Sequence, residues 1–452
     1  MARASIQHQR SLSVPSDLHR AAYTGSAERT MAVLLREPSA IDQRDPHGKT
    51  ALILATMNGH LRIVTILLSK GASASIEDED GLTALHASAT GGDMDATRLL
   101  VQAGADLDAA CFSGYTPLHG ASAAGHADVL RFLIEAGADP DKRSGSDRST
   151  PLSWACNLGN LDAVMELLRA KADPLLGKLF ECPREGGSTR IGEISPLDAA
   201  AVKGHAHVVR ALIQEVGIEG CGGSSGGVDA LHGAATMDHV DVLMILAGAG
   251  VQDPTGFVVI TAIQGGSEAS LKFLLQQQED EGATRGVALV DVAYKGTGYT
   301  PVYFAVASGR CTSRILRMLI DAGANTQSAI RVSRIAGGPT LFNGTPIALA
   351  MRCLTEKRVQ PLHGEEDATE EQLRGLEAIR RLLLQAEAAR GTPWLWHEDG
   401  HVPVDRGDGD AEGEKRFMTT ARATAVVLPI PTRRARPGGA LFAAMGRYSR
   451  KA

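Results

Sequence analysis

Residues 116–140 read TPLHGASAAGHADVLRFLIEAGADP, and this stretch decides the fold of the chain. Thr116 is suited to cap a helix, because its hydroxyl can accept a backbone N–H of the first turn. Pro117 fits the first helical position, where no donor is needed, and Gly125 can end the helix in the left-handed conformation. The apolar residues from about Ala127 predict a second helix, closed by a Gly-Ala-Asp step.

The same phrase recurs along the chain at a nearly constant interval. It begins at Thr50, Thr83, Thr116 and Thr150, so the spacings are 33, 33 and 34 residues. A unit of two short helices cannot bury its own apolar face, and successive copies must therefore stack on one another. The sequence predicts an all-α solenoid of stacked helix-turn-helix units with hairpin loops.

These copies resemble the ankyrin repeat, whose family pattern is G-x-T-P-L-H-x-A-A-x-x-G-H with a G-A-D step after the second helix. Weaker copies begin near Leu18, Ser195, Ala230, Ala262, Thr300 and Thr345. The resemblance implies about ten repeats over residues 16–390. It also implies that the histidines of the P-L-H and G-H positions hydrogen-bond neighbouring backbone, which is a structural role.

The spacing divides the chain into four predicted segments. They are a disordered N-terminus (1–15), regular repeats (16–172), degenerate repeats with loop insertions (173–390), and an acidic-then-basic tail expected to be disordered (391–452). The excess length of the second half falls at Leu175–Glu193, Gly220–Gly227 and Gln276–Gly298. The resemblance implies that these connections form hairpin fingers and loops at a binding edge. The alternative is that this half is partly disordered.

The composition limits the function classes. Only 4 % of the residues are aromatic while 50 of 452 are glycine, which is typical of many thin packing layers. A net charge of −6 argues against a chain-wide nucleic-acid-binding surface.

Six scattered cysteines without a C-x-x-C pair favour a reducing compartment, the cytoplasm or alternatively the nucleus. No apolar stretch is long enough to span a membrane. The N-terminus lacks the apolar region of a secretory signal, and a transit peptide is the alternative interpretation of this segment.

Two short motifs imitate catalytic sequences. Gly48-Lys49-Thr50 ends like a phosphate-binding loop, but Gln43 stands where that loop needs glycine. Gly222–Gly226 satisfies G-x-S-x-G, but its glycine-rich flanks favour a flexible loop over a nucleophile elbow. We therefore expect a chain that is not an enzyme, with no catalytic residues, no cofactor and no metal.

Basic residues are concentrated in the C-terminal tail, whereas the rest of the chain is acidic. Residues 415–452 hold nine basic residues and no acidic one, and because the whole chain carries −6, the residues before them carry −15. One interpretation is a solvated tail that folds back on the acidic array. Another is a nuclear-localisation or anionic-surface patch at Arg433–Arg436. A third is that Leu428–Pro431 resembles the end of a suppressor-of-cytokine-signalling box, although the upstream leucine-to-cysteine helix of that family has no counterpart here.

These observations predict a non-catalytic scaffold or adaptor, monomeric, that binds another protein through the hairpin tips and the concave ankyrin surface. The alternative is a ubiquitin-ligase substrate receptor or a nuclear regulatory protein that uses the basic tail. No specific nucleic acid is expected as a partner. The candidate contact residues occupy positions that the repeat leaves free. Phe112, Ser113 and Tyr115, with Asn157 and Leu158 further on, are expected to add a small aromatic–polar patch, in which exposed Phe112 and Tyr115 are the strongest candidates. The candidate contact residues are Pro46, His47, Lys49, Met57, Asn58, Glu79, Asp80, Leu82, Thr90, Phe112, Ser113, Tyr115, Asn157 and Leu158.

Overall fold

The computed structural model describes most of the chain between residues 16 and 389. The described residues are 16–183, 189–280, 300–307, 312–326, 330–333, 340–344, 358–359, 366–367 and 370–389, with single positions 291, 346 and 350 and without 146 and 254. They form two compact units: residues 16–200 and 207–224 belong to the first, and the other described residues belong to the second. The predictions for residues 1–15 and 391–452 lie outside the described residues.

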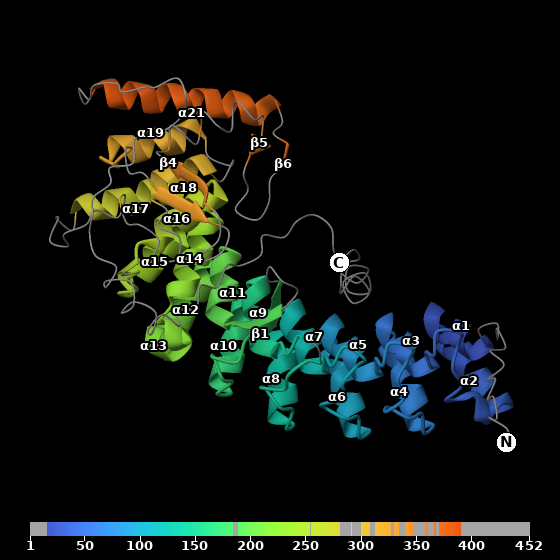
Figure 1. The fold of residues 1–452 in the computed structure, drawn as a ribbon. Coiled ribbons are helices and arrows are strands. Elements are labelled where there is room, and N and C mark those ends of the chain that lie inside the picture. Colours follow the sequence, from blue (N-terminus) through green and yellow to red (C-terminus); the bar gives the residue numbers. More distant parts are fainter. Residues whose placement is uncertain are drawn as a thin grey trace, which may run out of the picture. The chain divides into compact units, whose positions relative to one another are not determined.

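The first unit begins with five helix pairs, in which an inner helix is followed by an outer one (Figure 1). The inner helices are α1 (Asp17–Thr24), α3 (Ala51–Met57), α5 (Ala84–Gly91), α7 (Pro117–Ala124) and α9 (Pro151–Leu158). The outer helices are α2 (Ala27–Arg36), α4 (Leu61–Ser69), α6 (Met94–Gln102), α8 (Ala127–Glu135) and α10 (Leu161–Arg169). A short 3-10 turn, η1 (Pro38–Ala40), follows α2. The predicted helix starts at Thr50, Thr83, Thr116 and Thr150 are confirmed, because each threonine is the N-cap of its inner helix.

The helix ends follow from the residues that were expected to fix them. In α7, the backbone N–H of Thr116 donates to Nδ1 of His119 over 3.1 Å, and Pro117 occupies the first turn. Gly125 ends the helix with φ of 80°, which only glycine adopts without strain. The layers are held together by leucines of the inner and outer rows, such as Leu118, Leu130 and Leu133, which are fully buried. Burial of each such side chain stabilises the fold by about 2 kcal/mol.

The turns between repeats are linked to one another through the backbone. Glu79 N–H donates to the carbonyl oxygen of His47 (3.1 Å), and Phe112 N–H donates to that of Asp80 (3.1 Å). Gly145 N–H donates to the carbonyl oxygen of Ser113 (2.9 Å). We call these three backbone hydrogen bonds the tip ladder. The last link requires Gly114, because a Cβ on it would lie 2.1 Å from the nitrogen of Gly145.

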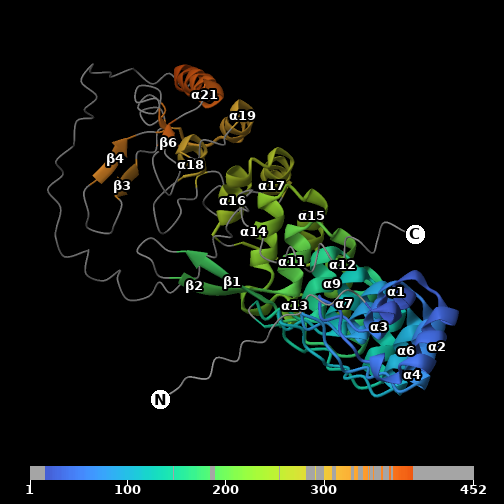
Figure 2. The same ribbon diagram turned by 90° about the vertical axis from the view of Figure 1, so that its right-hand side faces the viewer.

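The insertion predicted at Leu175–Glu193 contains a β-hairpin. Strands β1 (Lys178–Pro183) and β2 (Thr189–Ile194) pair antiparallel, with Lys178 opposite Ile194 (Figure 2). The predicted insertion at Gly220–Gly227 contains the end of α13 (Ile218–Cys221) and a 3-10 turn, η2 (Gly223–Ser225). The fully buried side chain of Cys221 anchors this segment. Helices α11 (Pro196–Val202) and α12 (Ala206–Val216) lie where the chain passes between the two units.

The second unit continues the alternation of paired helices. Its elements are α14 (Val228–Thr236), α15 (Val240–Gly248), α16 (Phe257–Gly265), α17 (Glu268–Asp280), α18 (Pro301–Ala307), α19 (Ser313–Asp321) and α21 (Glu370–Ala389). Its strands form two further antiparallel hairpins, from β3 (Ile330–Ser333) with β4 (Thr340–Gly344) and from β5 (Arg358–Val359) with β6 (Glu366–Asp367). The described chain is therefore a helical repeat structure with short β-hairpin insertions, which confirms the predicted class. The segment boundary predicted at residues 172 and 173 stays a prediction, since the two units reflect compactness rather than repeat regularity. Most of the insertion predicted at Gln276–Gly298 lies outside the described residues.

Candidate functional site

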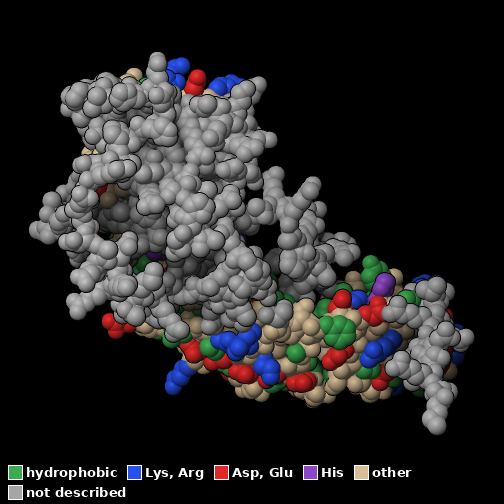
Figure 3. Space-filling model, viewed as in Figure 1, with side chains coloured by type: hydrophobic (Ala, Val, Ile, Leu, Met, Phe, Trp, Pro, Cys, Tyr) green, Lys and Arg blue, Asp and Glu red, His purple; other side chains and the backbone are tan. Residues whose placement is uncertain are grey.

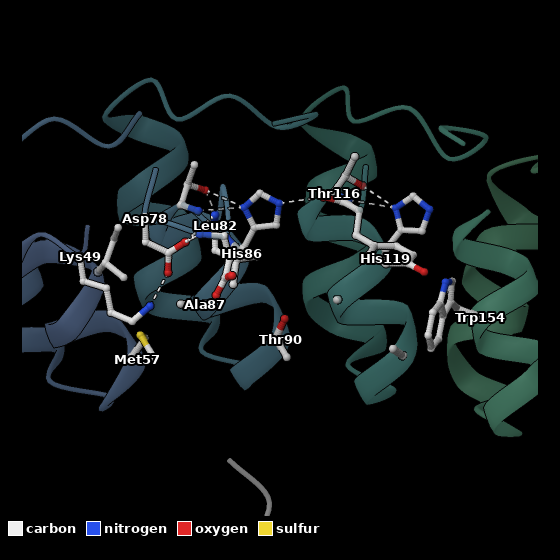
Figure 4. Close-up of a pocket in the computed structure, with 16 residues that line it drawn as sticks. Lys49, Met57, Asp78, Leu82, His86, Ala87, Thr90, Thr116, His119 and Trp154 are labelled. Atoms are coloured by element: carbon white, nitrogen blue, oxygen red, sulfur yellow. Dashed lines mark hydrogen bonds and ion pairs between the residues drawn. The ribbon is translucent and has the colours of Figure 1, made fainter. Parts of the chain in front are cut away.

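A groove runs along the inner helices α3, α5, α7 and α9 of the first unit (Figure 4). It is open to solvent, and the side-chain surface that it exposes is mostly apolar. The lining residues are Lys49, Ile53, Met57, Asp78, Asp80, Leu82, Thr83, His86, Ala87, Thr90, Tyr115, Thr116, His119, Gly120, Ala123 and Trp154.

The groove exists because its floor is made of small residues. Ala87, Gly120 and Ala123 contribute little side-chain volume, whereas Met57 and Trp154 stand at its two ends (Figure 4). Gly120 brings α7 close to α5, since a Cβ on it would lie 2.3 Å from Oγ1 of Thr90. Larger side chains at these three positions would fill the hollow.

One wall carries an ion pair between two neighbouring repeats. The Lys49 ammonium pairs with Oδ2 of Asp78, whose side chain is only 1 % exposed. The other oxygen of this carboxylate, Oδ1, accepts hydrogen bonds from the backbone N–H groups of Asp80 (3.0 Å) and Leu82 (2.9 Å). Because the buried charge is paired and hydrogen-bonded, this part of the wall adds no net charge to the groove.

The two histidines of the wall are held neutral. Nδ1 of His119 accepts from the N–H of Thr116, so Nε2 carries the proton and donates to the carbonyl oxygen of Ser149 over 3.0 Å. His86 makes the same pair of contacts in the preceding repeat. Burial lowers the pKa of His119 to about 4 and also lowers the pKa of His86. Neither imidazole has a nitrogen left over for acid–base chemistry or metal binding.

The far end of the groove is an aromatic cluster. The rings of Tyr115 and Trp154 meet edge to face with centroids 5.4 Å apart. Tyr115 donates its hydroxyl to Oδ2 of Asp147 (3.2 Å), and Trp154 donates its indole N–H to Oγ of Ser149 (2.9 Å). Partial burial and the nearby Asp147 carboxylate raise the pKa of Tyr115 to about 12. These contacts fix both rings and leave apolar aromatic surface facing the groove.

Comparison with protein-family models identifies the repeat. The model described as "Ankyrin repeats" matches in three overlapping copies, at residues 15–78, 64–144 and 92–178. Residues 15–178 are ankyrin repeats. A search of the curated proteins finds no match to it. Ankyrin repeats generally mediate interactions between proteins and are typically not catalytic.

The histidines of the ankyrin array have the structural role that the resemblance implied. At the G-H position, His60 bonds the carbonyl oxygen of Tyr23 (3.1 Å) and His126 that of Thr90 (3.2 Å). His232 of the second unit differs, because its Nε2 contacts Oδ2 of Asp253 (3.1 Å) rather than a carbonyl group. In the part of the chain that the structure describes, no group of three His, Cys, Asp or Glu side chains could hold a metal ion.

Neither of the two motifs that resemble catalytic sequences has the surroundings that catalysis would need. Lys49 of the Gly-Lys-Thr phrase is engaged with Asp78 rather than available to a phosphate. The Gly222–Gly226 phrase follows helix α13, whereas a nucleophile elbow follows a strand. None of the described helices combines the length and the apolar character needed to cross a lipid bilayer.

The ankyrin groove brings together six of the predicted contact residues and leaves eight outside it. Those that line it are Lys49, Met57, Asp80, Leu82, Thr90 and Tyr115. Those that do not are Pro46, His47, Asn58, Glu79, Phe112, Ser113, Asn157 and Leu158. Among the latter, Pro46, His47, Glu79, Phe112 and Ser113 are exposed at the tips of the turns, and Asn58 is exposed just after α3. Whether any of these residues binds a partner stays a prediction.

Two parts of the predicted aromatic–polar patch need correction. Phe112 is 78 % exposed, but Tyr115 is half-buried because it packs against Trp154 and bonds Asp147. Asn157 and Leu158 are the last residues of α9, whereas Phe112 precedes α7. Since an eight-residue helix is about 12 Å long, the patch is divided between opposite ends of the inner helices.

The sequence interpretation missed the floor of the ankyrin groove and Trp154 at its aromatic end. Counting four residues from each capping threonine gives Leu54, Ala87, Gly120 and Trp154, of which the last three line the groove. Counting seven gives Met57, Thr90, Ala123 and Asn157. Residues three or four apart share a helix face, so reading these two columns across the repeats could have found the site.

Proposed function

We propose that the protein is a non-catalytic adaptor that holds a segment of a protein partner in the groove of α3, α5, α7 and α9. The observation that carries this proposal is an apolar hollow, open to solvent, in whose wall Lys49, Asp78 and His119 are already bonded within the protein. Such a surface gains free energy by covering apolar area and requires few polar groups from its partner. Ankyrin repeats generally mediate interactions between proteins, which supports the coarser part of this proposal.

The chemistry of the groove favours binding over catalysis. Both nitrogens of His86 and of His119 are engaged, and the Asp78 carboxylate is paired with Lys49. A general acid or base needs a titratable group that can reach a substrate, which these side chains do not offer. The features behind the ubiquitin-ligase and nuclear alternatives, Leu428–Pro431 and the basic tail, lie outside the described residues.

Filling the groove is expected to weaken partner binding at least about tenfold, because a larger side chain removes the space an anchor would occupy. The variants are Ala87→Gln and Ala123→Gln, and the control is Ala32→Gln, which changes an exposed residue of α2 in the same way. Peptides selected from a displayed random library on the full-length protein serve as ligands, and fluorescence polarisation gives their Kd. If the groove variants bind like the control, the partner surface lies elsewhere on the chain.

Phe112 tests whether the turn tips contribute to the same interaction. Its side chain is 78 % exposed, so Phe112→Ala is expected to change the free energy of unfolding by less than about 0.5 kcal/mol. An exposed aromatic residue that becomes buried in an interface is worth about 2 kcal/mol, so the variant is expected to bind the selected peptides more weakly. Urea unfolding and fluorescence polarisation measure the two effects. Unchanged affinity would remove Phe112 from the binding surface.

A further inference from the structure

One end of the groove is bordered by a run of acidic residues. Glu77, Asp78, Glu79 and Asp80 are consecutive, and we call them the acidic turn. Asp78 is neutralised by Lys49, but the other three side chains are exposed. Among the described residues, neither Glu79 nor Asp80 forms an ion pair. The visible face of the first unit in Figure 3 is different, because basic and acidic side chains are interspersed on it.

An exposed aromatic ring stands beside the acidic turn. The backbone N–H of Phe112 donates to the carbonyl oxygen of Asp80, so the two tips are adjacent, and the Phe112 side chain is 78 % exposed. Carboxylates next to an aromatic face attract guanidinium groups by charge and by cation–π contact. From Asp80, the apolar groove continues to Trp154. The surface thus fits a segment with arginines at one end and apolar residues at the other.

The chain itself contains a segment with this pattern. Residues 426–436 read VVLPIPTRRAR, in which six apolar residues are followed by Thr432 and then by three arginines among four residues. Pro429 and Pro431 restrict the backbone to extended conformations, which lowers the entropy lost on docking. Eleven residues in such a conformation span about 34 Å. Four packed helices at about 10 Å spacing give a groove of about 30 Å, so the lengths agree.

We propose that residues 426–436 occupy the groove of the same chain when no partner is bound, with Arg433–Arg436 at the acidic turn and Val426–Pro431 over Ala87 and Ala123. This inference rests on the proposed function, because the segment would cover the surface that a partner needs. A partner would then have to displace it, and the tail would act as a built-in competitor. Thirty-six residues separate the segment from Ala389 at the end of α21, so the covalent connection sets no tight limit.

The test uses the full-length protein and a fluorescein-labelled peptide of residues 424–438. Arg433, Arg434 and Arg436 are replaced by glutamate to release the attached segment, and the matched control replaces Lys415, Arg416 and Arg422 by glutamate. The released protein is expected to bind the peptide about fivefold more tightly than the wild type, because the attached segment no longer competes. The control should bind like the wild type.

Charge reversal at the acidic turn locates the site. In the released protein, Glu79→Lys with Asp80→Lys is expected to weaken peptide binding at least about tenfold. Asp95→Lys with Glu135→Lys makes the same charge change at exposed positions of α6 and α8 and should have little effect. A peptide of scrambled sequence controls for general attraction between opposite charges. Equal binding of the scrambled peptide, or no effect of the acidic-turn variant, would overturn the proposal.

A photo-crosslink shows whether the tail segment occupies the groove of its own chain or that of a second copy. Benzoylphenylalanine at position 430 of the full-length chain is expected to crosslink to fragments carrying Ala87 or Ala123 within a single chain. Crosslinking between two chains would assign the groove to a second copy and overturn the proposal of self-docking. If the tail peptide fails to bind but Ala123→Gln still weakens the binding of the library peptides, only the proposal of self-docking is wrong. If the library peptides are also insensitive to Ala123→Gln, the proposed function fails as well.

Discussion

Replacing His119 by glutamine is expected to make the protein less sensitive to acid. Between pH 6.5 and pH 4, His119 should cost the wild type about 3 kcal/mol of its free energy of unfolding, and the variant should not show this loss. In the folded protein, burial lowers the pKa of His119 from 6.5 to about 4. The unfolded chain therefore binds a proton in this window that the folded chain does not, so stability falls as the pH falls from 6.5 and levels off below about 4. The pKa difference corresponds to about 3 kcal/mol.

The substitution also has a cost at neutral pH. Glutamine cannot make both hydrogen bonds of His119, to Thr116 and to Ser149, so the variant is expected to be about 1–3 kcal/mol less stable at pH 7. The two stability curves should approach each other as the pH falls. Urea unfolding at pH 7, 6, 5 and 4 measures this, and His47→Gln, which changes an exposed histidine, is the control. Parallel curves for His119→Gln and wild type would show that His119 is not kept neutral by the fold.

Truncation of a central leucine should give the other large effect. Leu118→Ala removes a fully buried side chain from α7, between the layers of α5 and α9, and is expected to lower the free energy of unfolding by about 2–5 kcal/mol. In a solenoid each repeat contacts only its neighbours, so a weakened central layer has no other layer to compensate for it.

A matched substitution on the surface makes the comparison quantitative. Leu35 belongs to α2 and its side chain is 73 % exposed, so Leu35→Ala should change the free energy of unfolding by no more than about 0.5 kcal/mol. Urea denaturation followed by circular dichroism compares both variants with the wild type. Comparable losses for Leu118→Ala and Leu35→Ala would contradict the layered core described above.

The helix pairs could be predicted because their signals are local. Thr116 and Pro117 begin a helix and Gly125 ends it through contacts within a few residues, and the periodicity then supplies the stacking. In the second half the same signals located helix starts at Pro196 and Pro301, although the spacing is irregular.

The groove could not be predicted in the same way, because it depends on pairs of residues far apart in the sequence. Lys49 meets Asp78 across 29 positions, and Tyr115 meets Asp147 across 32. Sequence reasoning treated Lys49 and Tyr115 as free contact residues, since nothing near them in the sequence reveals these partners. The β-hairpin at Lys178–Ile194 was expected only as an inserted finger, because its pairing is set by a register that the sequence pattern leaves open.

The tip ladder bears on how the array can change in evolution. Each link is a single backbone hydrogen bond between neighbouring turns, from Glu79 to His47, from Phe112 to Asp80, and from Gly145 to Ser113. Because backbone groups form these links, the junction depends little on the side chains of the turns, apart from glycines such as Gly114, where a Cβ would meet the next turn. A gene segment encoding one repeat could therefore be duplicated or lost without leaving a neighbouring turn unmatched. The turn positions other than these glycines are thus free to diversify while the junctions stay interchangeable.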